Sequence, residues 1–259
     1  AYVSSDGNIS IDLPQNINRI ILVASGSSYH CARYAAELFG TISKIEASAV
    51  YSSEFLLENT IAHDENILYI FITQSGETTD TNSALEKAKE HGVKTLCITN
   101  KENSTIWNAS DYKIACLAGE EKSIAATKSF TSQLLCSTLL ALKFAQNNGI
   151  DVYDYVLDLK TIPSYINKTF ELRPKIKQLA RFLSKFKNII MTADGQSYAL
   201  AKEASLKIKE TSYISTTSAI LGEFMHGHVA VLNNKNAVLV YILNDDLTYT
   251  ATKNLNKIK

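Results

Sequence analysis

The sequence predicts an α/β protein built from two similar units in tandem, each a parallel sheet flanked by helices in a flavodoxin-like three-layer sandwich. Two observations lead to this prediction. Short runs rich in β-branched residues alternate with longer segments of helical periodicity, which is typical of parallel strands joined by helices. After a break that ends near residue 175, the pattern of the first unit begins again at a constant offset along the chain.

The first unit is expected to contain five strands and four helices. The apolar runs predict strands at Ile20–Ala24, Ile45–Val50, Ile67–Thr73, Lys94–Thr99 and Tyr112–Cys116. Helical periodicity predicts helices at Tyr29–Leu38, Ser53–Leu57, Thr79–His91 and Lys128–Gln146. Polar and acidic residues over 77–80 stand at the start of the third helix, where they can accept hydrogen bonds from free backbone N–H groups.

A change of pattern separates the two units. From Asn147 to Pro174 the strand–helix alternation weakens, and two of the three prolines of the chain fall in this stretch. We therefore expect a first domain over residues 1–150, a partly helical connector over 151–175 and a second domain over 176–259.

The second unit repeats the first at an offset of 169 residues. The matching residues are Gly26 and Gly195, Ser28 and Ser197, Tyr29 and Tyr198, and Glu54-Phe55 and Glu223-Phe224. The strand predicted at 67–73 falls on 236–242 at the same offset, which indicates an internal duplication. The first unit continues well beyond its third strand, whereas the chain stops at Lys259, so we expect the second unit to be incomplete at its C-terminal end.

Composition argues against several classes of function. Lys and Arg together number 26, as do Asp and Glu, so no basic field suggests a nucleic-acid partner. No apolar run approaches the ~18 residues of a membrane span. The four cysteines are scattered through apolar runs, and the histidines lack metal-ligand spacing. We expect a cytoplasmic protein that needs neither metal nor cofactor.

Two loops rich in small hydroxyl residues predict a phosphate site. Ser25-Gly26-Ser27-Ser28 follows the first strand, and Thr73-Gln74-Ser75-Gly76-Glu77-Thr78 follows the third. Ligands of parallel sheets bind at the carboxyl ends of the strands, where hydroxyls and helix N-termini can hold a phosphate without a cation. Either loop alone could simply form a turn. Neither matches a Walker P-loop or a dinucleotide motif, so the two together favour a small phosphorylated ligand.

Two further segments bear on this site. Residues 122–128 open the helix predicted at 128 and could close the pocket. In the second unit, the position of Gln74-Ser75-Gly76 falls on Leu243-Asn244-Asp245, which lacks the hydroxyls. The phosphate site is therefore expected in the first unit alone.

A charged stripe is predicted on the helix expected at Ala199–Ser212. Glu203, Lys207 and Glu210 are spaced i, i+4 and i+7, so they share one face. The buried face is expected to hold Leu200, Ala204, Ile208 and Thr211. A Glu–Lys–Glu ladder is common on solvated helices, so spacing alone does not make this stripe a site.

Taken in order, these motifs resemble the sugar-isomerase (SIS) domain family, and most closely the isomerase modules of the glucosamine-6-phosphate synthases (glutamine–fructose-6-phosphate aminotransferases). The resemblance runs from about Gly7 to the end of the chain. It rests on the segments A-S-G-S-S-Y, T-Q-S-G-E-T, A-A-T-K-S-F-T-S-Q, E-A-S-L-K-I-K-E-T-S-Y and G-E-F-M-H-G. It implies two tandem SIS subdomains, the second of them truncated.

The resemblance also implies roles for particular residues. The sugar phosphate would be held by Ser28, Thr73, Gln74, Ser75 and Thr78, with the backbone near Ala125 closing over it. Glu210 would move a proton between C1 and C2 of the open-chain sugar. His226 would open the sugar ring from the partner subunit of a homodimer, and Glu203 and Lys207 would tune the site and contact the sugar. Such a reaction needs a carboxylate within reach of both carbons and a cation for the enediolate charge.

Three positions depart from the synthase pattern. Thr73 and Ala126 stand where the synthases have serine, and His228 stands where they have proline. The segment E-K-S-I-A-A-T-K is closer to stand-alone relatives such as the glucosamine-6-phosphate deaminases.

Three functions follow from the resemblance. The leading one is a phosphosugar isomerase, the sugar half of glucosamine-6-phosphate synthesis from fructose-6-phosphate. A stand-alone glucosamine-6-phosphate deaminase or fructosamine-6-phosphate deglycase is a second, and a sugar-phosphate-sensing regulatory module is a third. A sensor needs the phosphate loops but neither Glu210 nor His226, so the presence of both favours an enzyme.

Overall fold

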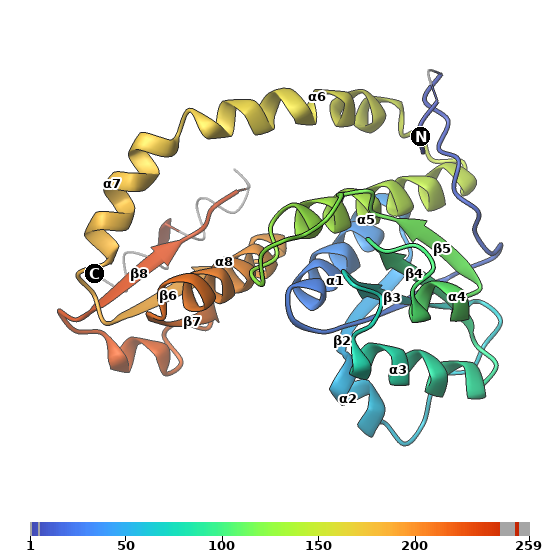
Figure 1. The fold of residues 1–259 in the computed structure, drawn as a ribbon, viewed down its shortest axis with the longest axis horizontal. Helices are drawn as coiled ribbons and strands as arrows, with labels where there is room; N and C mark the ends of the chain where they lie inside the picture. The colour runs from blue at the N-terminus through green and yellow to red at the C-terminus, as the bar shows by residue number, and fades with distance from the viewer. Residues whose placement is uncertain (1, 5, 244–251, 254–259) are drawn as a thin grey trace. The chain divides into compact units, whose positions relative to one another are not determined.

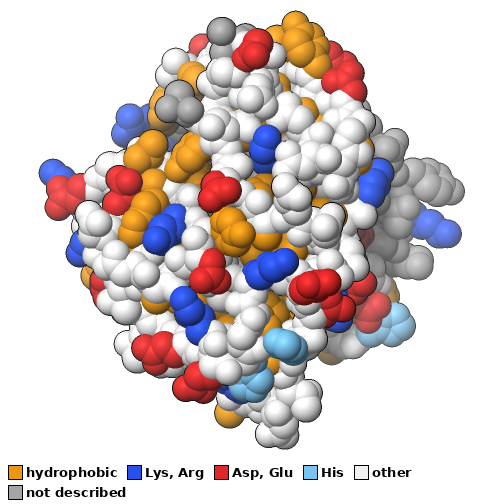
Figure 2. Space-filling view, turned by 90° about the vertical axis from the view of Figure 1, so that its right-hand side faces the viewer, with side chains coloured by type: hydrophobic (Ala, Val, Ile, Leu, Met, Phe, Trp, Pro, Cys, Tyr) orange, Lys and Arg blue, Asp and Glu red, His pale blue; other side chains and the backbone are white. Residues whose placement is uncertain are grey.

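A computed structural model describes residues 2–4, 6–243 and 252–253 of the chain. The chain forms two compact units, Ala1–Val156 and Leu157–Lys259, and each unit is described by itself. Lysine, arginine and acidic side chains are interspersed on the face of the molecule that Figure 2 shows, in keeping with the equal numbers of the two charges.

The first unit contains a five-stranded parallel sheet with the order β2-β1-β3-β4-β5 (Figure 1). Its strands are β1 (Arg19–Ala24), β2 (Glu46–Tyr51), β3 (Ile67–Thr73), β4 (Lys94–Thr99) and β5 (Tyr112–Ala115). All five predicted strands are confirmed, with their ends shifted by no more than one residue. The order is the flavodoxin-like one, in which the chain leaves β1 for one edge and returns to the other side of it.

The helices of the first unit cover both faces of this sheet. They are α1 (Gly26–Leu38), α2 (Ser52–Leu57), α3 (Thr79–Glu90), α4 (Thr105–Ala109) and α5 (Lys128–Asn147), and a π-helical turn, η1 (Phe39–Ser43), continues α1. The four predicted helices are confirmed, whereas the short α4 was not predicted. α1 packs against α5, and α2 packs against α3.

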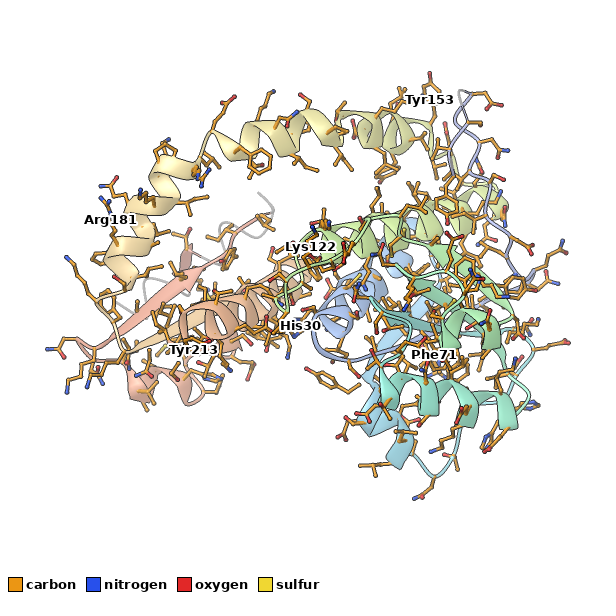
Figure 3. All side chains as sticks on the ribbon, in the orientation of Figure 1. His30, Phe71, Lys122, Tyr153, Arg181 and Tyr213 are labelled. Atoms are coloured by element: carbon orange, nitrogen blue, oxygen red, sulfur yellow. The ribbon has the colours of Figure 1, made fainter. Side chains whose placement is uncertain are left out.

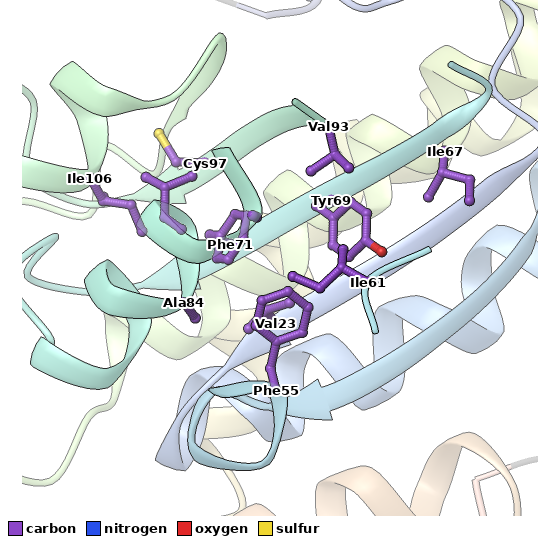
Figure 4. Packing of buried hydrophobic residues seen from close by; sticks show 12 residues of the cluster. Val23, Phe55, Ile61, Ile67, Tyr69, Phe71, Ala84, Val93, Cys97 and Ile106 are labelled. Carbon is purple, nitrogen blue, oxygen red and sulfur yellow. The ribbon is translucent and has the colours of Figure 1, made fainter. Parts of the chain in front are cut away.

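The core of the first unit is centred on β3, whose seven residues are all buried. Figure 4 shows the cluster between the sheet and α2, α3 and α4, in which Phe55 and Phe71 lie among Val23, Ala84 and Ile106. A strand buried on both faces reads as a continuous apolar run, and this is why Ile67–Thr73 was readily predicted from the sequence.

The stretch between the two sheets is helical over most of its length. α6 (Tyr153–Phe170) and α7 (Arg173–Leu183) occupy it, and Pro163 lies inside α6. Pro174 stands in the first turn of α7, where the missing N–H has no intrahelical partner to lose.

The second unit contains a smaller parallel sheet with the order β7-β6-β8. Its elements are β6 (Asn188–Ala193), α8 (Gln196–Ser212), β7 (Ser215–Ile220), the 3-10 turn η2 (His228–Val231) and β8 (Asn236–Val240). α8 packs on this sheet, with Ala201 in a buried cluster that includes Ile189 and Met191.

Strand register confirms the internal duplication. In the first unit Arg19 pairs with Glu46 on one side and with Ile67 on the other. In the second unit Asn188 pairs with Ser215 and with Asn236. These three pairs of equivalent positions are each 169 residues apart, so the two units repeat the same strand order and the same hydrogen-bonding register.

Candidate functional site

The two hydroxyl-rich loops lie side by side at the carboxyl ends of the strands of the first sheet. β1 and β3 are paired and parallel, so the loops that follow Ala24 and Ile72-Thr73 emerge together at their carboxyl ends. The chain leaves β1 into α1, which packs with α5, and leaves β3 into α3, which packs with α2. Such a switch point between neighbouring strands is where open α/β sheets bind ligands.

The first loop is shorter than the sequence predicted, because α1 begins at Gly26 rather than at Tyr29. Gly26 has a φ of 55° and Ser25 is extended, so the chain turns sharply into the helix. The N–H of Tyr29 donates to Ser25 O at 3.3 Å and makes the first intrahelical bond. The N–H groups of residues 26–28 precede that bond and form the positive end of the helix.

The hydroxyl of Ser28 is already engaged within the protein. Ser28 is buried, and its Oγ donates to Gln133 Oε1 on α5 at 3.1 Å. Ser28 therefore joins the start of α1 to α5, and its backbone N–H is the donor left for an anion. Sequence reasoning missed Gln133, because only the packing of α1 against α5 brings the two side chains together.

The second loop presents a pair of hydroxyls at the start of α3. Thr73 Oγ1 and Thr78 Oγ1 lie 2.8 Å apart, and one of the two supplies the hydrogen of this bond. The other keeps its hydrogen for a ligand. Ser75 Oγ accepts a hydrogen bond from the N–H of Glu77 at 3.1 Å, so its own O–H remains a donor. Gln74 is half-buried beside them.

The carboxylate of Glu77 is bound at the start of α4. Its two oxygens accept hydrogen bonds from Thr105, from the backbone N–H at 2.9 Å and from the hydroxyl at 2.7 Å. These bonds, the one from the hydroxyl first, lower the pKa of Glu77. The negative charge in the middle of the loop is thus compensated by donors on α4.

The segment between β5 and α5 is held by another carboxylate. Glu121 accepts hydrogen bonds from Thr127 and Ser129, through the backbone N–H and the hydroxyl of each, over distances of 2.7 to 3.2 Å. Partial burial raises the pKa of Glu121, but the bonds from Ser129 and Thr127 outweigh it and lower the pKa to about 2. Ala125 is buried, while Lys122, labelled in Figure 3, is exposed.

The charged stripe of the second unit forms a connected triad on α8. Lys207 Nζ lies 2.7 Å from Glu210 Oε2 and 3.4 Å from Glu203 Oε1. The Glu203 side chain is 7% exposed, against 31% for that of Glu210, so the triad runs from a buried end to a partly exposed end. The predicted common face of these three residues is confirmed.

The predicted buried face of α8 needs a correction. Ala204 and Ile208 are half-buried and pack against the core of the second unit, but Thr211 is exposed. Thr211 lies in the last turn of the helix, where its hydroxyl donates to the carbonyl of Lys207 at 2.7 Å. The fully buried positions of α8 include Ala199, Ala201 and Glu203. A charged residue at a buried position could not be predicted from hydrophobic periodicity.

His226 lies in the turns that follow β7 and is exposed. Its backbone N–H donates to Glu223 O at 2.9 Å. Within the described residues, its ring makes no hydrogen bond to the triad on α8. Of the second-unit positions equivalent to Gln74-Ser75-Gly76, Leu243 is described and exposed, and residues 244 and 245 lie outside the described residues.

Two absences hold for the part of the chain that the structure describes. No three His, Cys, Asp or Glu side chains gather there in a group that could hold a metal ion. None of the helices described is both long enough and apolar enough to cross a membrane.

Comparison with known proteins gives consistent results at the level of sequence. The model of the SIS domain family matches residues 15–143 and 182–259. A glutamine–fructose-6-phosphate aminotransferase (isomerizing) of Caldanaerobacter subterraneus is 32% identical over 97% of this chain and 42% of its own length. The protein of that name from Campylobacter jejuni is 35% identical over 93% of this chain and 40% of its own length. The chain therefore spans less than half the length of these curated relatives.

Solved structures extend the comparison. The C-terminal domain of glucosamine-fructose-6-phosphate aminotransferase from Francisella tularensis superposes with a TM-score of 0.91 at 30% identity, over 94% of this chain and 70% of that one. A glucosamine-6-phosphate deaminase from Thermotoga maritima has a TM-score of 0.78 at 22% identity, over 93% and 72% of the two chains. The second likeness shows a common fold alone.

Proposed function

Because this chain belongs to the SIS domain family, we propose that it is a phosphosugar isomerase domain, the sugar half of glucosamine-6-phosphate synthesis from fructose-6-phosphate. Its reaction would move a proton between C1 and C2 of the open-chain sugar. The proposal assigns phosphate binding to the first unit and proton transfer to residues of the second.

The observation that carries the proposal is the arrangement of donors at the switch point between β1 and β3. The N-termini of α1 and α3 emerge there from paired strands, and the hydroxyls of Thr73, Ser75 and Thr78 stand at the second of them. Glu77, the acidic residue of that loop, is compensated by Thr105. Donors from two helix ends and several hydroxyls suit a phosphate monoester dianion.

The triad on α8 has the chemistry that aldose–ketose interconversion needs. Glu210, at the partly exposed end, would take the proton from one carbon and return it to the other. Lys207 would stabilise the enediolate charge that forms between the two steps. Glu203 holds Lys207 from the buried side, so the ammonium keeps one carboxylate partner while Glu210 is protonated.

We propose a homodimer in which His226 of each subunit opens the sugar ring in the site of the other. The exposure of His226 on a turn supports this role, because a side chain that serves a neighbouring subunit must project from its own. We also propose a cytoplasmic location. The four cysteines are buried thiols, as is usual in a reducing compartment.

Solvent-deuterium exchange into the sugar tests the proposed reaction directly. In the full-length protein, Glu210→Gln keeps the shape of the side chain but cannot accept a proton. It should leave binding of glucosamine-6-phosphate in place and slow exchange at C1 or C2 by at least ~10²-fold. Glu171→Gln, at an exposed glutamate between α6 and α7, is the matched control and should exchange like wild type.

Two outcomes would overturn the proposal. Undiminished exchange in Glu210→Gln would remove Glu210 from proton transfer. Tight binding of sugar phosphate by the wild type without any exchange would favour the sensing module instead.

A further inference from the structure

One residue that none of the motifs includes contacts both the segment between β5 and α5 and the loop over 73–78, which is the proposed phosphate loop. Asn100 directly follows β4, at the same end of the parallel sheet as the loops after β1 and β3. Its Oδ1 accepts a hydrogen bond from the N–H of Ala118 at 2.8 Å, and its Nδ2 donates to Gly119 O at 2.7 Å. One carboxamide thus satisfies a donor and an acceptor of the turn that begins the segment.

The backbone of the same residue contacts the phosphate loop. The N–H of Asn100 donates to Gln74 O at 3.1 Å, and the hydroxyl of Thr99 lies 3.4 Å from the same carbonyl. Asn100 therefore touches residue 74 with its main chain and residues 118–119 with its side chain. Thr99 adds a second link, because its carbonyl accepts the N–H of Cys116 at 2.8 Å, but the side-chain bonds to residues 118 and 119 come from Asn100.

The backbone of the turn makes this fastening necessary. Leu117 has a φ of 52° and Gly119 a φ of 70°, so two of three successive residues are left-handed. For Leu117, which has a side chain, this region is unfavourable and needs support from its surroundings. Asn100 bonds to residue 118, which lies between these two residues, and to Gly119 itself. These bonds supply that support.

The far end of the segment is fixed by Glu121, which binds Thr127 and Ser129 at the start of α5. From there Gln133 reaches back to Ser28 on α1. Hydrogen bonds thus hold both ends of the segment: Asn100 joins its start to the loop after β3, and Glu121 joins its end to α5, which contacts the first turn of α1. The donors proposed for the phosphate lie on this loop and on that first turn.

We propose that Asn100 is a positioning residue that holds the segment 117–127 against the phosphate loop, and so sets the affinity for the phosphate group. This inference rests on the proposed function. Asn100 contacts the segment rather than the ligand. Its loss should therefore lower the affinity for every phosphorylated ligand by a similar factor and leave the proton-transfer residues unchanged.

Binding and hydrogen exchange test the proposal together. Asn100→Ala removes both side-chain bonds. It should weaken the binding of glucosamine-6-phosphate and of inorganic phosphate by about fivefold to thirtyfold each, because only part of the energy of two neutral hydrogen bonds would be lost from ligand binding. In the full-length enzyme KM should rise while kcat stays near wild type. Amide exchange over 117–127 should quicken in the ligand-free chain.

Asn108→Ala is the matched control. Asn108 is exposed on α4, and its side chain donates only to Asn103 O among the bonds described, at 3.2 Å. This variant should keep wild-type affinities and wild-type exchange over 117–127. If Asn100→Ala does not fold, Asn100→Asp serves in its place. It keeps the shape of the side chain and the acceptor for the N–H of Ala118, but it places a carboxylate oxygen against Gly119 O. It should weaken phosphate binding at least as much as Asn100→Ala.

The outcomes separate this inference from the proposed function. Failure of the wild type to bind any sugar phosphate would refute the proposed function, and with it the role of Asn100 in phosphate affinity. If the wild type binds and Asn100→Ala binds equally well, the function stands and the inference is overturned. Unchanged exchange over 117–127 in Asn100→Ala would overturn it as well, and this measurement needs no ligand.

Discussion

The hydroxyl oxygens of Thr73, the last residue of β3, and Thr78, the residue before α3, lie 2.8 Å apart and join the two ends of the loop over 73–78. Thr78→Val removes one hydroxyl and preserves the shape of the side chain. A hydrogen bond to a charged group contributes ~1.5–3 kcal/mol, so glucosamine-6-phosphate should bind about tenfold or more weakly by calorimetry. Thr138→Val, on α5, should bind like wild type. Equal affinity of the wild type for glucosamine and glucosamine-6-phosphate would contradict the phosphate site.

Gly76 is required in the loop over 73–78 for two separable reasons. Its φ is 70°, and a Cβ there would overlap the Ser104 side chain. We expect Gly76→Ala to lower the free energy of unfolding of the first unit by ~1–3 kcal/mol. Gly149→Ala is the control, because Gly149 has a φ of 76° but open space around a new Cβ, and it should cost about 1 kcal/mol.

Urea unfolding followed by the fluorescence of Trp107 measures both variants. Trp107 is the single tryptophan of the chain and packs against the core of the first unit, so it reports on that unit. An equal loss of stability in the two glycine variants would show that backbone strain, and not the contact with Ser104, determines the requirement at residue 76.

Glu121 should make the stability of the first unit depend on acid. Its pKa in the folded chain, about 2, lies below the ordinary value of 4.5. The carboxylate therefore stabilises the fold above pH 4.5, and this contribution is lost as the pH falls towards 2. Because the side chain is only partly buried, we expect Glu121→Gln to cost about 1 kcal/mol at neutral pH, as for a helix cap.

The difference between wild type and Glu121→Gln should shrink as the pH approaches 2, again by Trp107 fluorescence in urea. Glu120→Gln is the matched control, since Glu120 is exposed and adjacent, and it should follow the wild type at each pH. A constant difference across this range would show that the Glu121 carboxylate is not the stabilising group.

Subunit mixing tests whether His226 acts across a dimer. Full-length Glu210→Gln and His226→Ala variants should each lose nearly all activity. When the two variants pair at random, half of the dimers are mixed, and one of the two sites in each mixed dimer carries neither substitution. Activity should therefore recover to about a quarter of wild type. If activity does not recover although subunit exchange is confirmed, His226 serves its own chain.

The sequence alone was sufficient to predict the strands of the first unit, the duplication and its register. Both sheets are parallel, so their central strands are buried on two faces and stand out as unbroken apolar runs such as Ile67–Thr73. The offset of 169 residues, read from a few matching residues, holds in the pairing of Arg19 and of Asn188. Both hydroxyl loops could be located because small residues at strand ends are a local signal.

Only the tertiary structure decided which side chains meet. Ser28 and Gln133 are 105 residues apart in the chain, and Asn100 contacts segments on either side of it in sequence. Such pairs depend on strand order and on the packing of helices across the sheet, and neither leaves a periodic trace in the sequence. The burial of Glu203 belongs with them, because a carboxylate at a buried position is tolerated only when its partners, here Lys207, are folded against it.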